Sequence, residues 1–348
     1  GSRTKPMIRN SLAALLLALL FAPGLRAQEL QLDALGAFEL AFQPARPVQS
    51  YPGQQVAAAV TYRQGEAFIV PSPGRVQQIA YLVEPGAAVR QGQPFAVLRG
   101  PEMHHFEMAY ESSRALLAGA ERRYQANKGL YERKAISESQ WLEISEKYYA
   151  LSLEYEHMRH FFELVVEGDK DPDALTLTAP LSGVIDYSPA PGGVQEGDSI
   201  AQFVPDAAIR LEATLPNRLR DQVIALQWGD CEPAVERVSA MTEGFFVRVW
   251  SVPLAAACRP LLGQQLLVTP LLAVQGAYSL PRSAVFQLQR QTMVLVREGD
   301  RLRPLAVSLL GARGEDYVLQ PAADLGDREV LVSSVSAVQG MLLGLGGE

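Results

Sequence analysis

Residues 178–204 read TAPLSGVIDYSPAPGGVQEGDSIAQFV, and residues 70–98 read VPSPGRVQQIAYLVEPGAAVRQGQPFAVL. Both stretches have a proline with a glycine three positions later, then an apolar run, a Pro-Gly pair, a valine, and a glycine three residues after that valine. Short apolar runs broken by Pro-Gly and Gln-Gly are typical of a β-rich module. Each copy is too small to bury its own apolar face, so we expect the two copies to assemble around one shared core.

The residues between the two copies have helical composition. From Glu102 to Val166 there is no proline, and glycine occurs only at Gly119 and Gly129. Apolar side chains recur at alternating spacings of three and four, which predicts two helices packed along each other. The first helix carries this seam at Phe106, Tyr110, Leu117, Ala120, Tyr124 and Tyr131, with Ser113 and Asn127 interrupting it, and the second at Trp141, Ile144, Tyr148, Leu151, Tyr155, Met158, Phe162 and Val165.

A short connection joins the two predicted helices. Ser137 and Gln140 have the spacing of a capping box, which predicts the start of the second helix. Because the connection is short, the helices must run antiparallel, and about 30 residues per arm give a hairpin roughly 45 Å long. After Gly168 the sequence again shows alternating apolar runs separated by turn residues, as in β-strands, and it shows no βαβ alternation. The chain is therefore predicted to be mainly β with an inserted helical hairpin.

The chain carries the signals of an exported protein. It has 348 residues and a net charge of −7, and this acidic balance excludes the basic footprint of a nucleic-acid-binding protein. Residues 7–27 combine Arg9, an apolar run and a final alanine, which predicts a secretory signal peptide. In an exported protein, Cys231 and Cys258 are expected to form a disulfide, and two buried free thiols are the alternative.

The two copies and their surroundings resemble one family. The order of PGRVQQIAYLVEPGAAVRQGQPFAVL, LRGPEM, LYERKAISESQW, APLSGVIDYSPAPGGVQEGDSI, LPRSAVF and LGDREVLVSS resembles the periplasmic adaptor subunits, or membrane fusion proteins, of tripartite efflux systems. The GPEM and AISESQ segments and the short hairpin are most similar to the heavy-metal branch of the resistance-nodulation-division (RND) adaptors.

This resemblance implies four modules, each interrupted by the next. It implies a membrane-proximal β domain at 28–50 and 280–348 and a β-barrel at 51–67 and 205–279. It further implies a split lipoyl-like sandwich at 68–100 and 174–204 and the helical hairpin at 101–173. A protein of this kind has no enzymatic activity and no cofactor.

The resemblance also implies partners. Such a chain forms a trimeric or hexameric ring in the periplasm and bridges an inner-membrane pump, of RND type, to an outer-membrane channel, so that metal ions or small toxic compounds are exported. An adaptor for an ABC-type exporter is the nearest alternative. A lipoyl or biotinyl carrier would require a lysine in the repeated motif, and neither copy contains one.

No catalytic motif competes with this interpretation, but histidine and methionine cluster in the predicted hairpin. The stretches EMHHFEM and EHMRH contain Met108, His157, Met158 and His160, and a hairpin folded about residues 134 and 135 brings Met108 and His160 to similar heights. Imidazole and thioether groups suit Cu(I), and imidazole alone suits Zn(II), so these four are the candidate metal ligands. The alternative is that Met158 fills the helix seam and the others face solvent.

The predicted hairpin tip is the candidate docking site. In the resembled family, an arginine, a leucine four residues later and a serine seven residues beyond that dock the outer-membrane channel. Leu130 and Ser137 match the last two positions, but Ala126 stands at the arginine position. Arg123 shares a helix face with Leu130 because the two are seven residues apart. The candidate docking residues are Arg123, Lys128, Leu130, Arg133 and Ser137.

Overall fold

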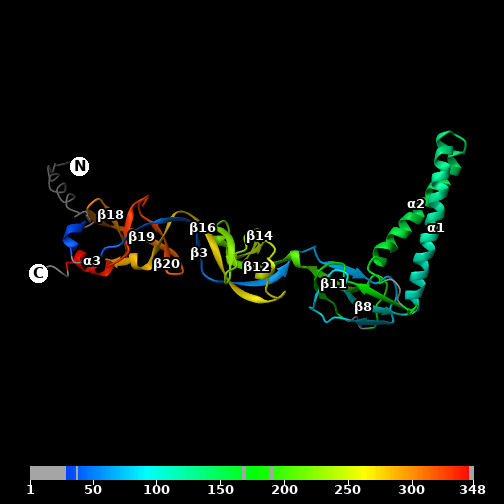
Figure 1. Cartoon of the computed structure of the whole chain (residues 1–348), viewed down its shortest axis with the longest axis horizontal. Helices are drawn as coiled ribbons and strands as arrows, with labels where there is room; N and C mark the ends of the chain where they lie inside the picture. Colours follow the sequence, from blue (N-terminus) through cyan, green and yellow to red (C-terminus); the bar gives the residue numbers. More distant parts are fainter. Residues whose placement is uncertain (1–28, 37, 167–169, 189–191, 345–348) are drawn as a thin grey trace, which may run out of the picture. The chain divides into compact units, whose positions relative to one another are not determined.

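The computed structural model describes residues 29–36, 38–166, 170–188 and 192–344 (Figure 1). The expected signal peptide at residues 7–27 lies outside these residues. The chain divides into two compact units, and the boundaries of the four expected modules stay a prediction. In the described part the chain is mostly β, with three α-helices, which confirms the expected mainly β class. One unit is Gly1–Gln55, Arg218–Gln227 and Thr269–Glu348, and the other is Val56–Asn217 and Trp228–Val268.

The first unit is built around a strand that is buried on both faces. In β18 (Gln291–Glu298), Val294 and Val296 lie in one hydrophobic core and Leu295 lies in another. Successive side chains of a strand point to opposite faces, so the continuous apolar run of β18 joins the two cores. The other elements of this unit are β1 (Leu30–Gln31), η1 (Leu32–Leu35), β2 (Phe42–Pro44), β3 (Arg46–Pro52), β13 (Val223–Gln227), most of β16 (Gln265–Pro281), η5 (Arg282–Ala284), β17 (Phe286–Leu288), β19 (Arg301–Arg313), β20 (Asp316–Pro321), β21 (Glu329–Leu331) and α3 (Val335–Leu342).

The second unit contains an antiparallel sheet with one buried face. Its strands are ordered β14-β15-β12-β4, and β4 also pairs with the first residues of β16. In β12, Leu211, Ala213 and Leu215 are buried, whereas Glu212 and Thr214 between them are more accessible. This alternation is the period of a strand with one buried face. The elements are β4 (Val56–Tyr62), η2 (Asp206–Ala208), β12 (Ile209–Pro216), η3 (Asn217–Leu219), β14 (Val235–Glu243), β15 (Phe246–Ser251) and η4 (Ala256–Cys258).

The two copies of the repeated motif form two small sheets in the same unit. One sheet has the order β5-β11-β10-β7 and the other has the order β6-β8-β9, and each sheet takes strands from both copies. Neither copy therefore forms a sheet alone. The strands of the first copy and its flanking residues are β5 (Phe68–Pro71), β6 (Gln78–Tyr81), β7 (Ala88–Val89) and β8 (Pro94–Arg99), and those of the second copy and its flanking residues are β9 (Ala174–Thr178), β10 (Gly183–Asp186) and β11 (Ser199–Pro205).

A single hydrophobic core joins the two copies. Phe95 of the first copy and Phe203 of the second are both 0% exposed, and their rings meet edge to face with centroids 5.0 Å apart. The expectation of a shared core is therefore confirmed. The buried members of this core are Val70, Val76, Val89, Phe95, Ala96, Leu98, Met103, Leu175, Leu177, Ala179, Ile185, Val194, Ile200, Ala201 and Phe203.

A second aromatic pair repeats the contact nearer the surface. Tyr81 and Tyr187 stack with centroids 3.6 Å apart and almost parallel planes. The Tyr81 hydroxyl donates to the Ile200 carbonyl at 2.7 Å, and the Tyr187 hydroxyl donates to the Val83 carbonyl at 2.7 Å. Each tyrosine thus donates its hydrogen bond to the opposite copy.

The backbone pairing between the copies is reciprocal. Val76 of the first copy bridges Val194 of the second, and Gly183 of the second pairs with Val89 of the first. A Cβ at Gly183 would stand 2.0 Å from the carbonyl oxygen of Val204, so only glycine fits where β10 passes β11. At Gly74, the equivalent glycine of the first copy, a Cβ would meet the end of the Glu102 side chain at 3.1 Å.

We expect Gly183→Ala to destabilise the second unit by at least about 2 kcal/mol, because the methyl group collides with backbone that cannot move away. Gly74→Ala is the matched control. It should cost much less, since the flexible Glu102 carboxylate can give way. Calorimetric melting of the two variants compares them directly, and equal losses of stability would contradict the close backbone contact at Gly183.

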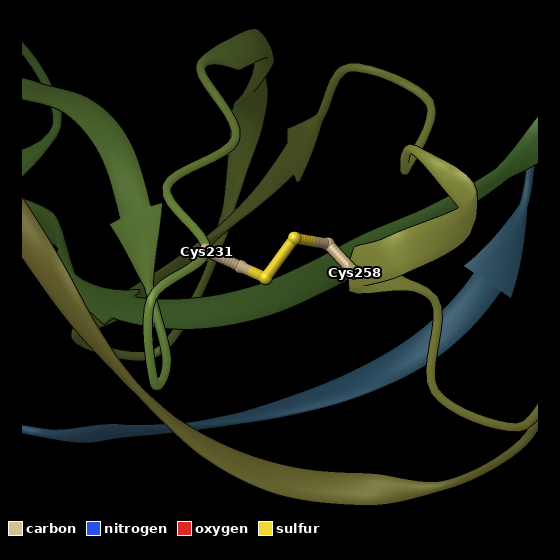
Figure 2. The surroundings of a disulfide bond; sticks show 2 residues. All are labelled: Cys231 and Cys258. Atoms are coloured by element: carbon tan, nitrogen blue, oxygen red, sulfur yellow. A yellow bond between two sulfur atoms is a disulfide. The ribbon is translucent and has the colours of Figure 1, made fainter.

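A disulfide joins two loops of the second unit. Cys231 lies in the tight turn that starts at Trp228, and Cys258 ends η4 (Figure 2). The two Cα atoms are 5.8 Å apart and the bond spans 27 residues. The described part of the chain contains no free cysteine. The bond ties the loop that precedes β14 to the loop that precedes β16, which gives two otherwise irregular segments a covalent support.

Replacement of both cysteines by serine should lower the stability of this unit by about 3 kcal/mol, because the open chain gains conformational freedom in the unfolded state. Chemical denaturation, followed by the fluorescence of Trp228 and Trp250 near the loops, measures this loss. Alkylation of the denatured, unreduced wild-type protein is the control. Two labelled thiols in that control would show that the bond is not formed in the wild-type protein.

Candidate functional site

The segment inserted between the two copies is an antiparallel helical hairpin. It consists of α1 (Pro101–Glu132) and α2 (Glu138–Phe162), which lie side by side (Figure 1). Pro101 stands at the first position of α1, where its fixed φ and missing N–H favour a helix start. No helix of the described residues is both long and apolar enough to span a membrane.

The base of the hairpin is embedded in the shared core. Met103 of α1 is completely buried there, and Phe106, Phe161 and Phe162 pack against the same core. The rings of Phe106 and Phe162 are stacked with centroids 5.0 Å apart. In addition, the backbone N–H of Arg75 donates to the Glu102 carboxylate at 2.7 Å, which links the first copy of the motif to the first turn of α1. The helices are therefore fixed at their lower end by apolar packing.

The two ends of the insertion meet at the sandwich. Arg99, the last residue of β8, pairs with Ala174 of β9 and forms an ion pair with Asp171 at 2.6 Å. The N–H of Gly100 donates to the Asp173 carbonyl at 3.0 Å. Val165, expected as the last seam residue, instead lies beyond the end of α2 and forms a β-bridge with Leu177. The helix ends before Val165 because the backbone at that point already pairs with β9 of the sandwich.

Within the helices, the predicted seam is confirmed. Ile144 and Met158 of α2 are buried, and Ser113 of α1 is buried although it is polar. Its hydroxyl finds no hydrogen-bond partner among the described residues. The remaining predicted seam residues that lie in α1 and α2 are all half-buried. Aromatic rings gather in two groups along the seam: Phe106, Tyr110, Tyr155, Phe161 and Phe162 near the base, and Tyr124, Tyr131, Trp141, Tyr148 and Tyr149 towards the tip.

Two tyrosine pairs link the helices through their hydroxyl groups. Tyr110 and Tyr155 approach to 3.4 Å between their hydroxyl oxygens, and Tyr124 and Tyr149 approach to 3.2 Å. The hydrogen bond with Tyr155, together with burial, raises the pKa of Tyr110 to about 12. The Tyr110 phenol therefore keeps its proton near neutral pH and can share it with Tyr155.

The tip has a well-defined backbone. The N–H of Ala135 donates to the Leu130 carbonyl at 2.8 Å, and the N–H of Lys134 donates to the Tyr131 carbonyl at 2.9 Å. These two bonds form a Schellman motif, which ends α1 with Lys134 in the left-handed region at φ 59°. Ser137 then caps α2, and the predicted capping box with Gln140 is confirmed.

The candidate docking residues lie together at this end of the hairpin. Arg123, Lys128, Arg133 and Ser137 are exposed, whereas Leu130 is half-buried. Arg123 also borders a shallow hollow of about 250 Å³ on one flank of the hairpin. The hollow is lined by Ala115, Leu116, Gly119, Ala120, Arg123, Ile144, Lys147 and Leu151. Whether these residues dock a partner stays a prediction.

The candidate metal ligands differ from one another in their exposure to solvent. Met158 is 6% exposed inside the seam, whereas Met108 is 55% exposed. His157 and His160 are exposed on α2, and His160 lies within 4.0 Å of Glu156 and Glu163. The described residues contain no group of three or more His, Cys, Asp or Glu side chains that could hold a metal ion. The metal site stays a prediction, and the two thioethers differ in burial.

Sequence reasoning missed two features of the hairpin. The first is Lys134, which lacks the usual signal because a helix that ends in the left-handed conformation generally shows a glycine there. The second is the role of Phe161, which lies off the seam but packs against the shared core. The aromatic richness of the stretch HFF, residues 160–162, is the signal that could have indicated an anchored base.

The sequence matches no protein-family model and no curated protein. Solved structures are similar to the chain at low identity. ZneB from Cupriavidus metallidurans is 17% identical, with 84% of this chain and 92% of that chain covered and a TM-score of 0.33. The membrane fusion protein Spr0693 from Streptococcus pneumoniae R6 is 13% identical, with 62% and 99% covered and a TM-score of 0.36. The periplasmic adaptor protein EmrA is 14% identical, with 67% and 98% covered and a TM-score of 0.35.

Membrane fusion and periplasmic adaptor proteins are thus among the structures similar to this chain, as the sequence resemblance predicts. With TM-scores below 0.5, these likenesses carry no functional conclusion for the chain itself. A function must therefore be argued from the hairpin and the core that holds it.

Ser137→Ala should weaken the first turn of α2 by about 1 kcal/mol, because the Gln140 N–H loses its acceptor. The expected readout is about fivefold faster hydrogen exchange of the amides at the start of α2. Ser139→Ala, two residues away on the same turn, removes no capping oxygen and is the matched control. Equal acceleration in both variants would mean that the capping box does not hold the tip.

Proposed function

We propose that the protein is a non-catalytic adaptor that assembles into a ring in the periplasm and bridges an inner-membrane efflux transporter to an outer-membrane channel. In this role the β modules associate with one another and with the transporter, and the hairpin tip docks the channel. The chain acts through its shape and its contacts, so it requires no bound cofactor.

The observation that carries the proposal is the way the hairpin leaves the sandwich. Its two ends are bonded to each other where they leave the paired strands β8 and β9, through Arg99 with Asp171 and Gly100 with Asp173. Its base is packed into a core that two separate segments of chain build together. A helical hairpin whose base is fixed and whose tip is exposed suits a protein that must hold two partners at a set distance.

Ring assembly follows from the same interpretation. We infer that the membrane-proximal domain at 28–50 and 280–348 seals on the transporter, and that the barrel at 51–67 and 205–279 and the sandwich at 68–100 and 174–204 form the ring contacts. Large apolar side chains that are exposed on these modules support self-association, since such side chains gather at protein interfaces. They include Phe68, Ile69, Leu82, Met241, Phe245 and Leu267.

The transporter is proposed to be of the RND type, with metal ions or small toxic compounds as its substrates. This finer assignment rests on the GPEM and AISESQ segments of the sequence. The identity of the transporter is a direct outcome of affinity purification from membranes. Recovery of a nucleotide-binding exporter instead would assign the chain to the ABC-type systems.

The docking role is tested by photo-cross-linking in the native organism. A photoreactive amino acid at Ala135 samples the tip, and the same amino acid at Leu153, which is 74% exposed on α2, samples the side of the hairpin. A cross-link to an outer-membrane protein from position 135, with none from position 153, is the expected result. Absence of any such product from position 135 would refute the bridging function.

Leu130→Asp should abolish both the cross-link from position 135 and the export phenotype. A tip this small makes few contacts, so the loss of one central contact removes much of the affinity. The readouts are the cross-link yield and the growth of the strain on zinc, cobalt and copper salts and on antibacterial compounds.

Leu153→Asp is the control, because it places the same charge on the same hairpin away from the tip. Since Leu130 is half-buried, the helical content and cellular level of the variant must match the wild type. Unchanged export in a well-folded Leu130→Asp strain would show that this tip does not dock a channel.

A further inference from the structure

The tip of the hairpin has a charge opposite to that of the whole chain. Between residues 122 and 138 there are five cations and two carboxylates, a net charge of +3, whereas the chain carries −7. All seven of these side chains are exposed. We call the five cations the tip cations; they are Arg122, Arg123, Lys128, Arg133 and Lys134.

The tip cations form no ion pairs with the described residues. In the part of the chain that the structure describes, none of them forms an ion pair, although Glu132 and Glu138 stand close by in the sequence. Arginines elsewhere in the described residues are commonly paired: Arg159, on the same hairpin, contacts both Glu156 and Glu163. Unpaired like charges at one end of the hairpin repel one another and do not stabilise the fold.

Lys134 adds an independent observation. It holds φ 59°, in the left-handed region, at the position of the Schellman motif that glycine adopts at the lowest cost. Glycine or asparagine would end the helix with less strain. A lysine there carries a long cationic side chain at the turn between the two helices, at a cost to local stability. Strain of this kind is typical of positions that serve binding.

We propose that the tip recognises a protein surface that presents carboxylates, with Lys134 and Arg133 as the central cations. This inference rests on the proposed adaptor function, and it specifies the chemistry of the docking partner. The arginine expected at position 126 is alanine, so the positive charge is supplied from the turn and its flanks instead. Charges of this kind govern the rate and salt dependence of association more than its ultimate affinity.

A protein partner fits the tip better than a lipid surface does. Membrane-binding segments combine cations with large apolar side chains that enter the interface. At this tip, Leu130 and Ile136 are half-buried and Tyr131 is held in the helix seam, stacked on Trp141. The tip therefore offers charge and little free apolar surface, which matches an acidic protein face.

The test uses the full chain and the outer-membrane protein that cross-links to position 135. Its binding to the wild type is compared with that to Arg133→Glu/Lys134→Glu, at about 50 and about 500 mM NaCl. We expect about tenfold weaker binding of the variant at low salt and a loss of most of its salt dependence. Arg114→Glu/Lys147→Glu, with the same charge change farther down the hairpin, should bind as the wild type does.

Lys134→Gly separates recognition from folding. Because glycine relaxes the left-handed turn, this variant should melt at a higher temperature than the wild type and yet bind the channel several-fold more weakly. Lys134→Arg, which keeps the positive charge, should bind the channel as tightly as the wild type does. A Lys134→Gly variant that is more stable and binds fully would overturn the role of Lys134.

The remaining outcomes distinguish this inference from the proposed function. If a channel cross-links but neither charge reversal nor salt changes its binding, the acidic-partner inference is wrong and the adaptor function stands. If no outer-membrane protein cross-links to the wild type, both fail. Vesicles of phosphatidylethanolamine and phosphatidylglycerol serve as the lipid probe. If the charge reversal abolishes binding to these vesicles but leaves channel binding unchanged, the tip cations bind a membrane and not an acidic protein.

Discussion

The contact between Phe95 and Phe203 is the interaction on which the rest of this structure depends. These two rings come from segments separated by the whole helical hairpin, and both are fully buried. Burial of side chains of this size contributes about 1.5–3 kcal/mol each, and neither copy could supply such a core by itself. The fold of the sandwich is therefore complete only after the chain has passed out through the hairpin and returned.

This constraint gives the hairpin its fixed base. The sandwich closes only when β8 and β9 pair, and those two strands carry the two ends of the insertion. Met103 and the neighbouring phenylalanines then extend the same core into the first turns of the helices. The helices gain support from tertiary packing, which isolated helical hairpins lack in water. At the other end the turn is held by local hydrogen bonds and by the stacking of Tyr131 on Trp141, and its charged residues stay exposed to other molecules.

Much of this arrangement could be predicted from the sequence because it depends on periodicity and turn chemistry. The alternating spacing from Trp141 to Phe162 is long and regular, and the Ser137–Gln140 spacing has one physical meaning. The reciprocal pairing of the copies could not be predicted, since strand partners depend on the whole sheet. Lys134 was missed for a related reason. Its left-handed conformation is imposed by the hydrogen bonds of the turn, and no glycine marks it in the sequence. Met158 is buried in the seam, as its spacing predicts, and the metal site proposed for it and its neighbours stays a prediction.

The adjacency of the two hairpin ends has a consequence for how such a chain can vary. Arg99 and Ala174 are partners in one ladder, so the sandwich is closed identically whatever length of helix lies between them. Each heptad added to both arms would lengthen the hairpin by roughly 10 Å and continue the same seam. The length of the hairpin is therefore independent of the β core in this architecture, and it can increase or decrease in steps without any change to the sandwich.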